Sequence, residues 1–135
     1  MTLQYSTTVR NAKLDTVETT IGTAPVLTIR TGAAPANCAA ANSGTVLATL
    51  TLPSDWMANA SGGTKAMSGT WSDSSADNTG TAAHFRIHDS TATTCHAQGT
   101  VTATGGGGDM TVDNTSFAAA QAFNITTFTL TAGNA

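Results

Sequence analysis

Charged and aromatic side chains are scarce in this chain. Asp, Glu, Lys and Arg together make up 10% of its 135 residues, and Phe, Trp and Tyr make up 5%. The five basic residues are scattered, at positions 10, 13, 30, 65 and 86, and the formal net charge is −3. A nucleic-acid-binding protein needs a concentrated basic surface that neutralises phosphates. We therefore expect no nucleic-acid partner.

Long apolar runs and a secretion signal are also missing. No segment approaches the roughly 20 apolar residues that a membrane-spanning helix needs. The first residues, Met-Thr-Leu-Gln-Tyr, lack the basic start and apolar stretch of a signal peptide. We expect no membrane partner and synthesis in a cytoplasm.

Cysteine is rare. Cys38 and Cys95 are too few for a disulfide framework, and their spacing fits no zinc motif. Given a cytoplasmic origin, two small and partly buried thiols are the first interpretation. A single disulfide between them is the alternative.

Threonine and alanine are abundant instead, with 28 and 24 residues. Threonine is β-branched and favours a pleated, half-buried surface over a helix. The length fits one domain, and large apolar side chains are few, so each must count heavily in its core. Those side chains are Trp56, Trp71, Phe85, Ile87, Phe123, Ile125, Phe128 and Leu130.

The N-terminal segment differs from the rest. Leu14, Val17 and Ile21 recur at helical spacing, Ser6 or Thr7 can cap the first turn, and Gly22 is a suitable end. The pattern predicts a helix over residues 6–21. We therefore divide the chain into an N-terminal arm and helix, residues 1–24, and a β domain, residues 25–135.

Short alternating segments follow at regular spacing, which is typical of an all-β fold. The clearest are 26–30, 46–52, 84–88, 95–101 and 123–131. In the last of these the apolar positions change parity, and a β-bulge near Thr126 and Thr127 would reconcile them. Together these segments predict an all-β protein with one short N-terminal α-helix. The expected architecture is a β-sandwich, of which a jelly roll is one form.

Three histidines are candidate metal ligands. Alternation in 84–88 places His84, Arg86 and His88 on the face opposite Phe85 and Ile87. Pairing residue 89 with residue 95 across the hairpin would put His96 beside His88, whereas His84 would lie about 13 Å along the strand at roughly 3.3 Å per residue. Two ligands do not make a metal site, so we interpret these as surface or interface residues.

Other patterns of chemical interest are weak. Asp109 and Asp113 follow four glycines, but a calcium-binding repeat would need more than one copy, and no phosphate-binding Lys follows the run. No Gly-x-Ser-x-Gly motif is present. Trp56 and Trp71 would suggest a sugar-binding surface if exposed, although core packing is the better interpretation. We expect no enzyme, no cofactor and no metal.

Several stretches together resemble small virion structural proteins of tailed bacteriophages. They are Arg10 to Asp15 with Ile21-Gly22, Pro35 to Cys38, Ser43 to Leu50 with Leu52 to Trp56, and Ala83 to Ile87. The likeness spans most of the chain, and its motifs are structural rather than catalytic. For a β-sandwich of this size, the resemblance is greatest to head decoration, or cement, proteins.

The resemblance implies a protein of the capsid surface of a virion, made in the host cytoplasm. It would bind the major capsid protein of a phage head as a symmetric homo-oligomer, a dimer or a trimer, and stabilise contacts between capsomers. Alternatives are another virion component of the neck, tail or fibre base, or a carbohydrate-binding β-sandwich module. Our candidate partner-binding residues come from the N-terminal arm and the polar strand face, and they are Leu3, Tyr5, Arg10, Lys13, His84, Arg86 and His88.

Overall fold

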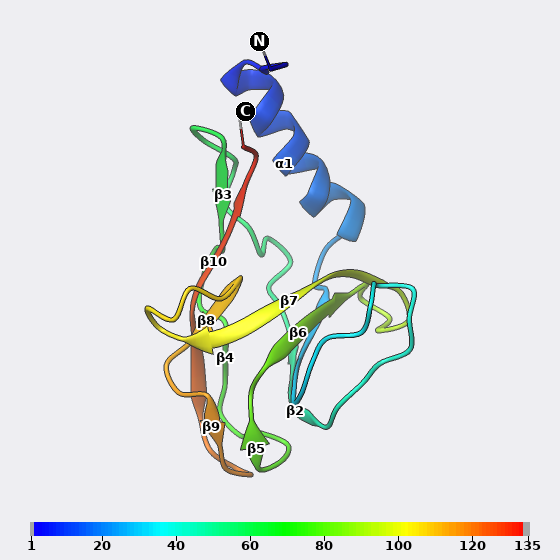
Figure 1. Cartoon of the computed structure of the whole chain (residues 1–135), viewed down its shortest axis with the longest axis vertical. Helices are drawn as coiled ribbons and strands as arrows, with labels where there is room; N and C mark the ends of the chain where they lie inside the picture. The colour runs from blue at the N-terminus through cyan, green and yellow to red at the C-terminus, as the bar shows by residue number, and fades with distance from the viewer. Residues whose placement is uncertain (1, 134–135) are drawn as a thin grey trace.

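The computed structural model describes residues 2–133 and contains, within that range, one helix and ten short strands (Figure 1). No helix in this range is long and apolar enough to span a membrane. In chain order the elements are α1 (Thr7–Ile21), β1 (Val26–Arg30), β2 (Val46–Thr51), β3 (Thr64–Ala66), β4 (Ser72–Asp73), β5 (Gly80–Thr81), β6 (His84–His88), β7 (Cys95–Ala103), β8 (Met110–Val112), β9 (Ser116–Phe117) and β10 (Phe123–Thr131).

Helix α1 begins and ends where the sequence predicts. The Ser6 hydroxyl accepts a hydrogen bond of 3.3 Å from the Val9 N–H, which caps the first turn. Gly22, at φ +92°, ends the helix in a conformation that glycine adopts without steric cost. Leu14 and Ile21 are buried. One face of the helix therefore packs against the rest of the chain.

Eight of the ten strands form one mixed sheet. Its order is β2-β1-β6-β7-β8-β10-β3, and β4 pairs with β10 beside this path. The pairs are antiparallel except for β7 with β8, which are parallel. Strands β5 and β9 form a separate two-stranded sheet. The expected all-β class with one short helix is thus confirmed.

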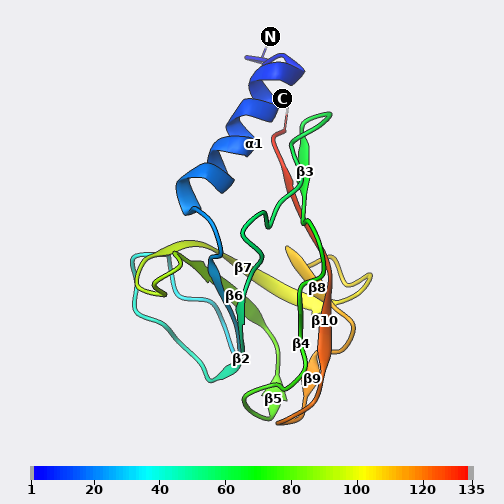
Figure 2. The same cartoon turned by 180° about the vertical axis from the view of Figure 1, so that it is seen from behind.

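Aromatic side chains join the two sides of the molecule. In both views β4, β8 and β10 lie on one side and β2 and β6 on the other (Figures 1 and 2). Phe85 of β6 packs edge-on against Phe128 of β10, with ring centroids 5.6 Å apart. Trp71 contacts Phe128 at 5.5 Å and Trp56 at 6.0 Å. Both tryptophans are at most 1% exposed, which confirms the core interpretation and removes the basis for a sugar-binding tryptophan surface.

The bulge predicted in the last strand is present. The register between β10 and β8 shifts between Ile125 and Thr127. An extra residue in one strand reverses which side chains face inward beyond it. Ile125 and Phe128, which differ in parity, are consequently both buried.

The hairpin of β6 and β7 follows the predicted register for only part of its length. His84 lies opposite Thr100, and Arg86 lies opposite Gln98, as expected. A register shift between Ile87 and His88 then places His88 opposite Cys95. The expected pairing of His88 with His96 is therefore wrong, because the bulge displaces His96 by one position.

The polar face of β6 is buried. His84 and Arg86 are 1% exposed and His88 is 5% exposed, so the prediction that they form a surface is wrong. Residues 31–45, here called the covering loop, fold back over this face and hydrogen-bond to it. Their small side chains permit that close approach. We call the buried polar residues of β1 and β6 the covered face: Thr28, Arg30, His84, Arg86 and His88.

Candidate functional site

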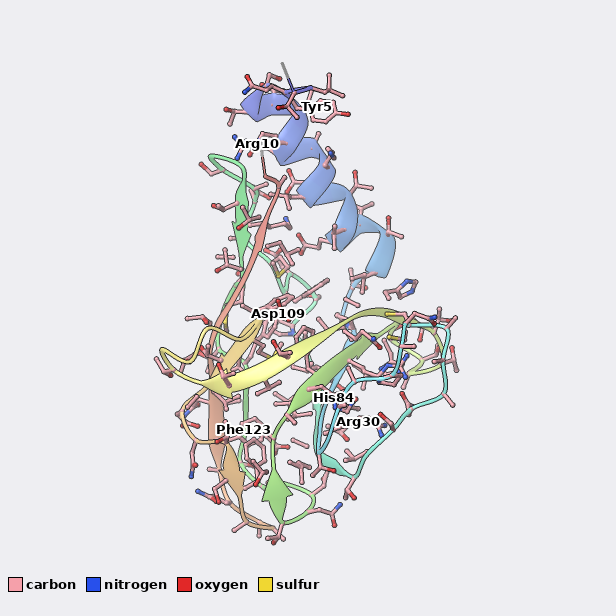
Figure 3. The ribbon with its side chains drawn as sticks, viewed as in Figure 1. Tyr5, Arg10, Arg30, His84, Asp109 and Phe123 are labelled. Atoms are coloured by element: carbon pink, nitrogen blue, oxygen red, sulfur yellow. The ribbon has the colours of Figure 1, made fainter. Side chains whose placement is uncertain are left out.

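Exposed apolar side chains gather at the N-terminal end of the chain. Among residues 2–133, the large apolar side chains that remain exposed are Leu3 at 72%, Tyr5 at 41% and Val9 at 42%. We call these three residues the N-terminal patch. The Lys13 ammonium lies over the Tyr5 ring, 4.4 Å from its centroid, and this cation–π contact holds the arm against α1. Tyr5 lies at the far end of the helix from the core (Figure 3).

Helix α1 is held to the sheet by a buried cation. Lys65 of β3 is 1% exposed, and its ammonium lies 2.7 Å from the Asp15 carboxylate and 2.8 Å from that of Glu18. It also donates to the Ala58 carbonyl at 2.9 Å. A buried ammonium needs such partners because an unpaired one is costly in an apolar interior. The helix is thereby fixed in one position relative to β3.

This pairing shifts the pKa values of both partners. Burial by itself lowers the pKa of Lys65, but the hydrogen bonds to Asp15 and Glu18 outweigh burial, and the pKa lies above its usual value. The hydrogen bond from Lys65, followed by one from the Ala60 N–H, holds the pKa of Asp15 below its usual range. Both residues therefore stay charged at neutral pH.

Two further side chains tie the start of α1 to the sheet, one to the end of β10 and one to the turn before β3. The Arg10 guanidinium donates to the Ala132 carbonyl at 2.7 Å, and the Asn11 side chain accepts from the Gly63 N–H at 2.9 Å. A side chain at Gly63 would collide with Arg10. Of the predicted contact residues in the arm, Leu3, Tyr5 and Lys13 are exposed, whereas Arg10 is half-buried and already engaged.

The covered face is organised around Arg86. Its guanidinium donates to the Cys38 carbonyl at 2.7 Å, the Ala40 carbonyl at 3.1 Å and the Asn42 side-chain oxygen at 2.7 Å. It also donates to the Cys95 sulfur at 3.3 Å. These acceptors belong to the covering loop and to β7. Among residues 2–133 the ion pairs are those of Lys65, so loop oxygens rather than a carboxylate compensate the Arg86 charge.

A second cation lies beside Arg86. Arg30 donates to the Thr28 hydroxyl at 3.2 Å and weakly to the Ser43 carbonyl at 3.4 Å (Figure 3). Burial, and then the charge of Arg86, lower the pKa of Arg30. Burial, and then the cations of Arg86 and Arg30, also lower the pKa of His88. The covered face therefore favours neutral His88.

Two buried histidine nitrogens on this face have no hydrogen-bond partner. They are Nε2 of His84 and Nδ1 of His88. The Nδ1 atom of His84, by contrast, lies 2.8 Å from the Gly32 carbonyl, which again joins β6 to the covering loop. Because they are at most 5% exposed, His84, Arg86 and His88 present little surface to a partner in this structure.

The residues considered for metal binding are apart from one another. His96 is exposed and lines a groove with α1, away from the covered face. Asp109 accepts from the N–H and hydroxyl of Thr100 at 2.8 and 2.9 Å, and Asp113 accepts from Asn124. Within the described residues no group of three or more His, Cys, Asp or Glu is placed to hold a metal ion.

Sequence reasoning missed the covering loop and its contacts with Arg86. One signal was present: two arginines, Arg30 and Arg86, occupy the polar faces of neighbouring strands with no acidic residue among them. Such a face needs oxygen acceptors from elsewhere if it is buried. The segment 31–45, whose small side chains let its backbone approach closely, supplies these oxygen acceptors.

Comparison with known proteins finds no matching family model, no matching curated protein and no matching solved structure.

Proposed function

We propose that this chain is a bacteriophage capsid decoration protein, which binds the outside of the head as a symmetric oligomer and stabilises contacts between capsomers. The supporting observation is the N-terminal patch: the exposed large apolar side chains among residues 2–133 all fall within residues 3–9. Exposed apolar groups that cluster in this way mark contact surfaces. The sequence resemblance to virion proteins supplies the setting.

The attachment of α1 supports a contact role for this patch. Lys65 fixes Asp15 and Glu18, and Arg10 fixes the start of the helix to residue 132. A patch held in one position loses little conformational freedom when it binds, so modest contacts yield more affinity. We assign capsid contact to Leu3 and Tyr5, with Lys13 beside them, and not to the covered face.

The remainder of the chain serves as a rigid body in this proposal. We further propose that the two sides of its sheet form a β-sandwich, of jelly-roll type, around the Trp56, Trp71, Phe85 and Phe128 cluster. A decoration protein acts by mass action: it binds the mature lattice more tightly than a broken one and so shifts the equilibrium toward the intact head. A dimer or trimer that engages several capsomers gains further from multivalency.

Quantitative mass spectrometry of purified virions tests the role in the particle. A decoration protein is present in a fixed ratio to the major capsid protein, with hundreds of copies a head, on the order of the lattice sites. A tail, neck or fibre-base component would give about six or twelve copies, and that result would overturn the proposal. Heads that lack the protein should also lose their DNA at a lower temperature.

A pair of variants tests the contact surface. Leu3→Ser with Tyr5→Ser should abolish binding to stripped heads while the free protein stays folded and melts only slightly lower, since both side chains are exposed and the cation–π contact of Tyr5 with Lys13 is lost. The matched control is Ala119→Ser with Ala122→Ser, which changes two exposed apolar residues in the turn between β9 and β10. Equal head binding by both double variants would show that the N-terminal patch is not part of the interface.

A further inference from the structure

The two cysteines of the chain meet where the covering loop crosses the sheet. The sulfur of Cys38, in the loop, lies 3.0 Å from the sulfur of Cys95, the first residue of β7, across a sequence separation of 57 residues. Both are half-buried free thiols. A disulfide has an S–S length of about 2.05 Å, so the sulfurs need to approach by only about 1 Å.

Arg86 holds the two cysteines in this position. One end of its guanidinium donates to the Cys38 carbonyl at 2.7 Å, and its Nε donates to the Cys95 sulfur at 3.3 Å. Because Arg86 is 1% exposed and its strand pairs with both β1 and β7, its side chain has little freedom to move. The proximity of the sulfurs is thus built into the sheet rather than left to a mobile loop.

We propose that Cys38 and Cys95 form a reversible disulfide that cross-links the covering loop to β7 when the protein passes from a reducing to an oxidising environment. The cross-link does not depend on which partner the chain binds. It would close the covering loop over the covered face and leave the hydrogen bonds of Arg86 in place.

The reaction balances with a small oxidised disulfide, such as glutathione disulfide, as the oxidant. One protein thiolate attacks that disulfide, forms a mixed disulfide and releases the first glutathione thiol. The second protein thiolate then displaces the other glutathione. The protein loses two electrons and two protons, and these appear on the two glutathione thiols.

The setting of the sulfurs allows such an exchange. Both cysteines line a polar cavity of about 240 Å³ together with residues 39–42, so a small reagent can reach them. Burial, and then the neighbouring Cys95 thiol, raise the pKa of Cys38 to about 11. In a reducing environment Cys38 therefore stays a protonated thiol, so at neutral pH the step in which its thiolate attacks is slow, and that step becomes faster as the pH rises toward this pKa.

A disulfide that closes a loop of this length restricts the unfolded chain strongly. We expect the oxidised protein to melt about 10 °C above the reduced protein. Amide hydrogens of residues 31–45 should also exchange more slowly after oxidation, because opening the loop would require the sheet to open with it.

The test starts from wild-type protein purified under reducing conditions and then treated, while folded, with glutathione disulfide. Unfolding and alkylation should show two free thiols before treatment and none after it, in a monomer that has lost two hydrogen atoms. Dithiothreitol should restore both thiols and the original melting temperature. Cys38→Ser and Cys95→Ser are the matched controls, and neither should gain thermal stability on oxidation.

Any one of the following results would overturn the proposal. Two thiols that remain alkylatable after treatment, glutathione retained on both sulfurs, or a disulfide-linked dimer would each show that the pair does not close within the chain. A cross-link that leaves both the melting temperature and the exchange of residues 31–45 unchanged would show that it does not hold the loop. The wild-type thiol count decides the question even where a serine variant fails to fold.

Discussion

The carbonyl oxygen of Cys38 accepts a hydrogen bond of 2.7 Å from the guanidinium of Arg86. This contact joins a loop of small residues to a central strand. With the Ala40 carbonyl and the Asn42 side chain, it surrounds a buried cation with oxygen dipoles. The covering loop is thus folded around a charge that the chain itself supplies.

Replacing Arg86 should release the covering loop. Arg86→Met keeps most of the side-chain volume but leaves the Cys38, Ala40 and Asn42 oxygens without their donor, and we expect a loss of about 3 kcal/mol in the free energy of unfolding. Urea denaturation measures it. Arg10→Met, which removes the hydrogen bond from a half-buried arginine to the Ala132 carbonyl, is the control and should cost clearly less. Equal losses would show that Arg86 does not organise the loop.

Removing the buried ammonium should loosen α1. In Lys65→Met, the helix loses the contacts through Asp15 and Glu18, and we expect a melting temperature lower by roughly 5 °C. Hydrogen exchange should accelerate in α1 more than in β1 and β6. Lys13→Met is the matched control, because that ammonium lies over the exposed Tyr5 ring rather than between elements. Unchanged exchange in α1 would contradict the role given to Lys65.

Stability should fall as the pH drops below the ordinary pKa of histidine. Burial and the cations of Arg86 and Arg30 lower the pKa of His88 from 6.5 against the opposing effect of Asp89, so the unfolded chain binds a proton that the folded chain resists. Folded stability therefore decreases from about pH 6.5 downward. The pKa of Asp15 is lowered from 3.8, so its contribution is lost only at more acidic pH.

Melting temperatures between about pH 7 and about pH 5 test this dependence. His88→Gln should flatten the decrease, whereas His96→Gln, at an exposed position, should leave it unchanged. A decrease of the same size in His88→Gln would show that another group is responsible.

Gly99 is required by a close approach in the hairpin. A Cβ there would lie 2.7 Å from the Asp109 carboxylate and 2.9 Å from the Phe85 ring. Asp109 has little room to yield, because it accepts two hydrogen bonds from Thr100. We expect Gly99→Ala to cost about 2 kcal/mol in the free energy of unfolding.

A double-mutant cycle locates the cause of that cost. Combining Gly99→Ala with Asp109→Ala should cost less than the sum of the two single changes, since the second substitution removes the carboxylate, the nearest obstacle, and leaves only the Asp109 Cβ at 3.0 Å. Gly133→Ala, where nothing lies within 4 Å of the added Cβ, should have no effect. Additive costs would indicate that strain against Phe85, not Asp109, is responsible.

Local patterns predicted much of the fold. The cap at Ser6, the end at Gly22 and the bulge in β10 each depend on a few neighbouring residues, and each was found where expected. The hairpin register failed at His88 because a bulge in one strand changes which residues meet, and nothing in the alternating pattern of residues 84–88 signals it. The order of strands, and the parallel pairing of β7 with β8, likewise depend on contacts between distant segments.

The same difference between local patterns and contacts of distant segments applies to the candidate site. Leu3 and Tyr5 were assigned to partner contact from their place in the N-terminal arm; the structure has both exposed, and partner contact by them stays a prediction. The histidines and Arg86 were assigned to the surface because strand alternation separates two faces but cannot say whether a second layer covers the polar one. Here residues 31–45 provide that layer, and they bring Cys38 to Cys95.

The amino-acid sequence by itself determined the longer strands, the two ends of α1 and the bulge in β10, since side-chain branching, hydrophobic alternation and glycine act over a few residues. Only the tertiary structure decided that Arg86 is buried, that Lys65 holds the helix and that the two thiols meet. Those outcomes depend on segments that are tens of residues apart in the sequence and pack together in the folded chain. There a buried charge is compensated by the oxygen atoms that the fold brings within hydrogen-bonding distance.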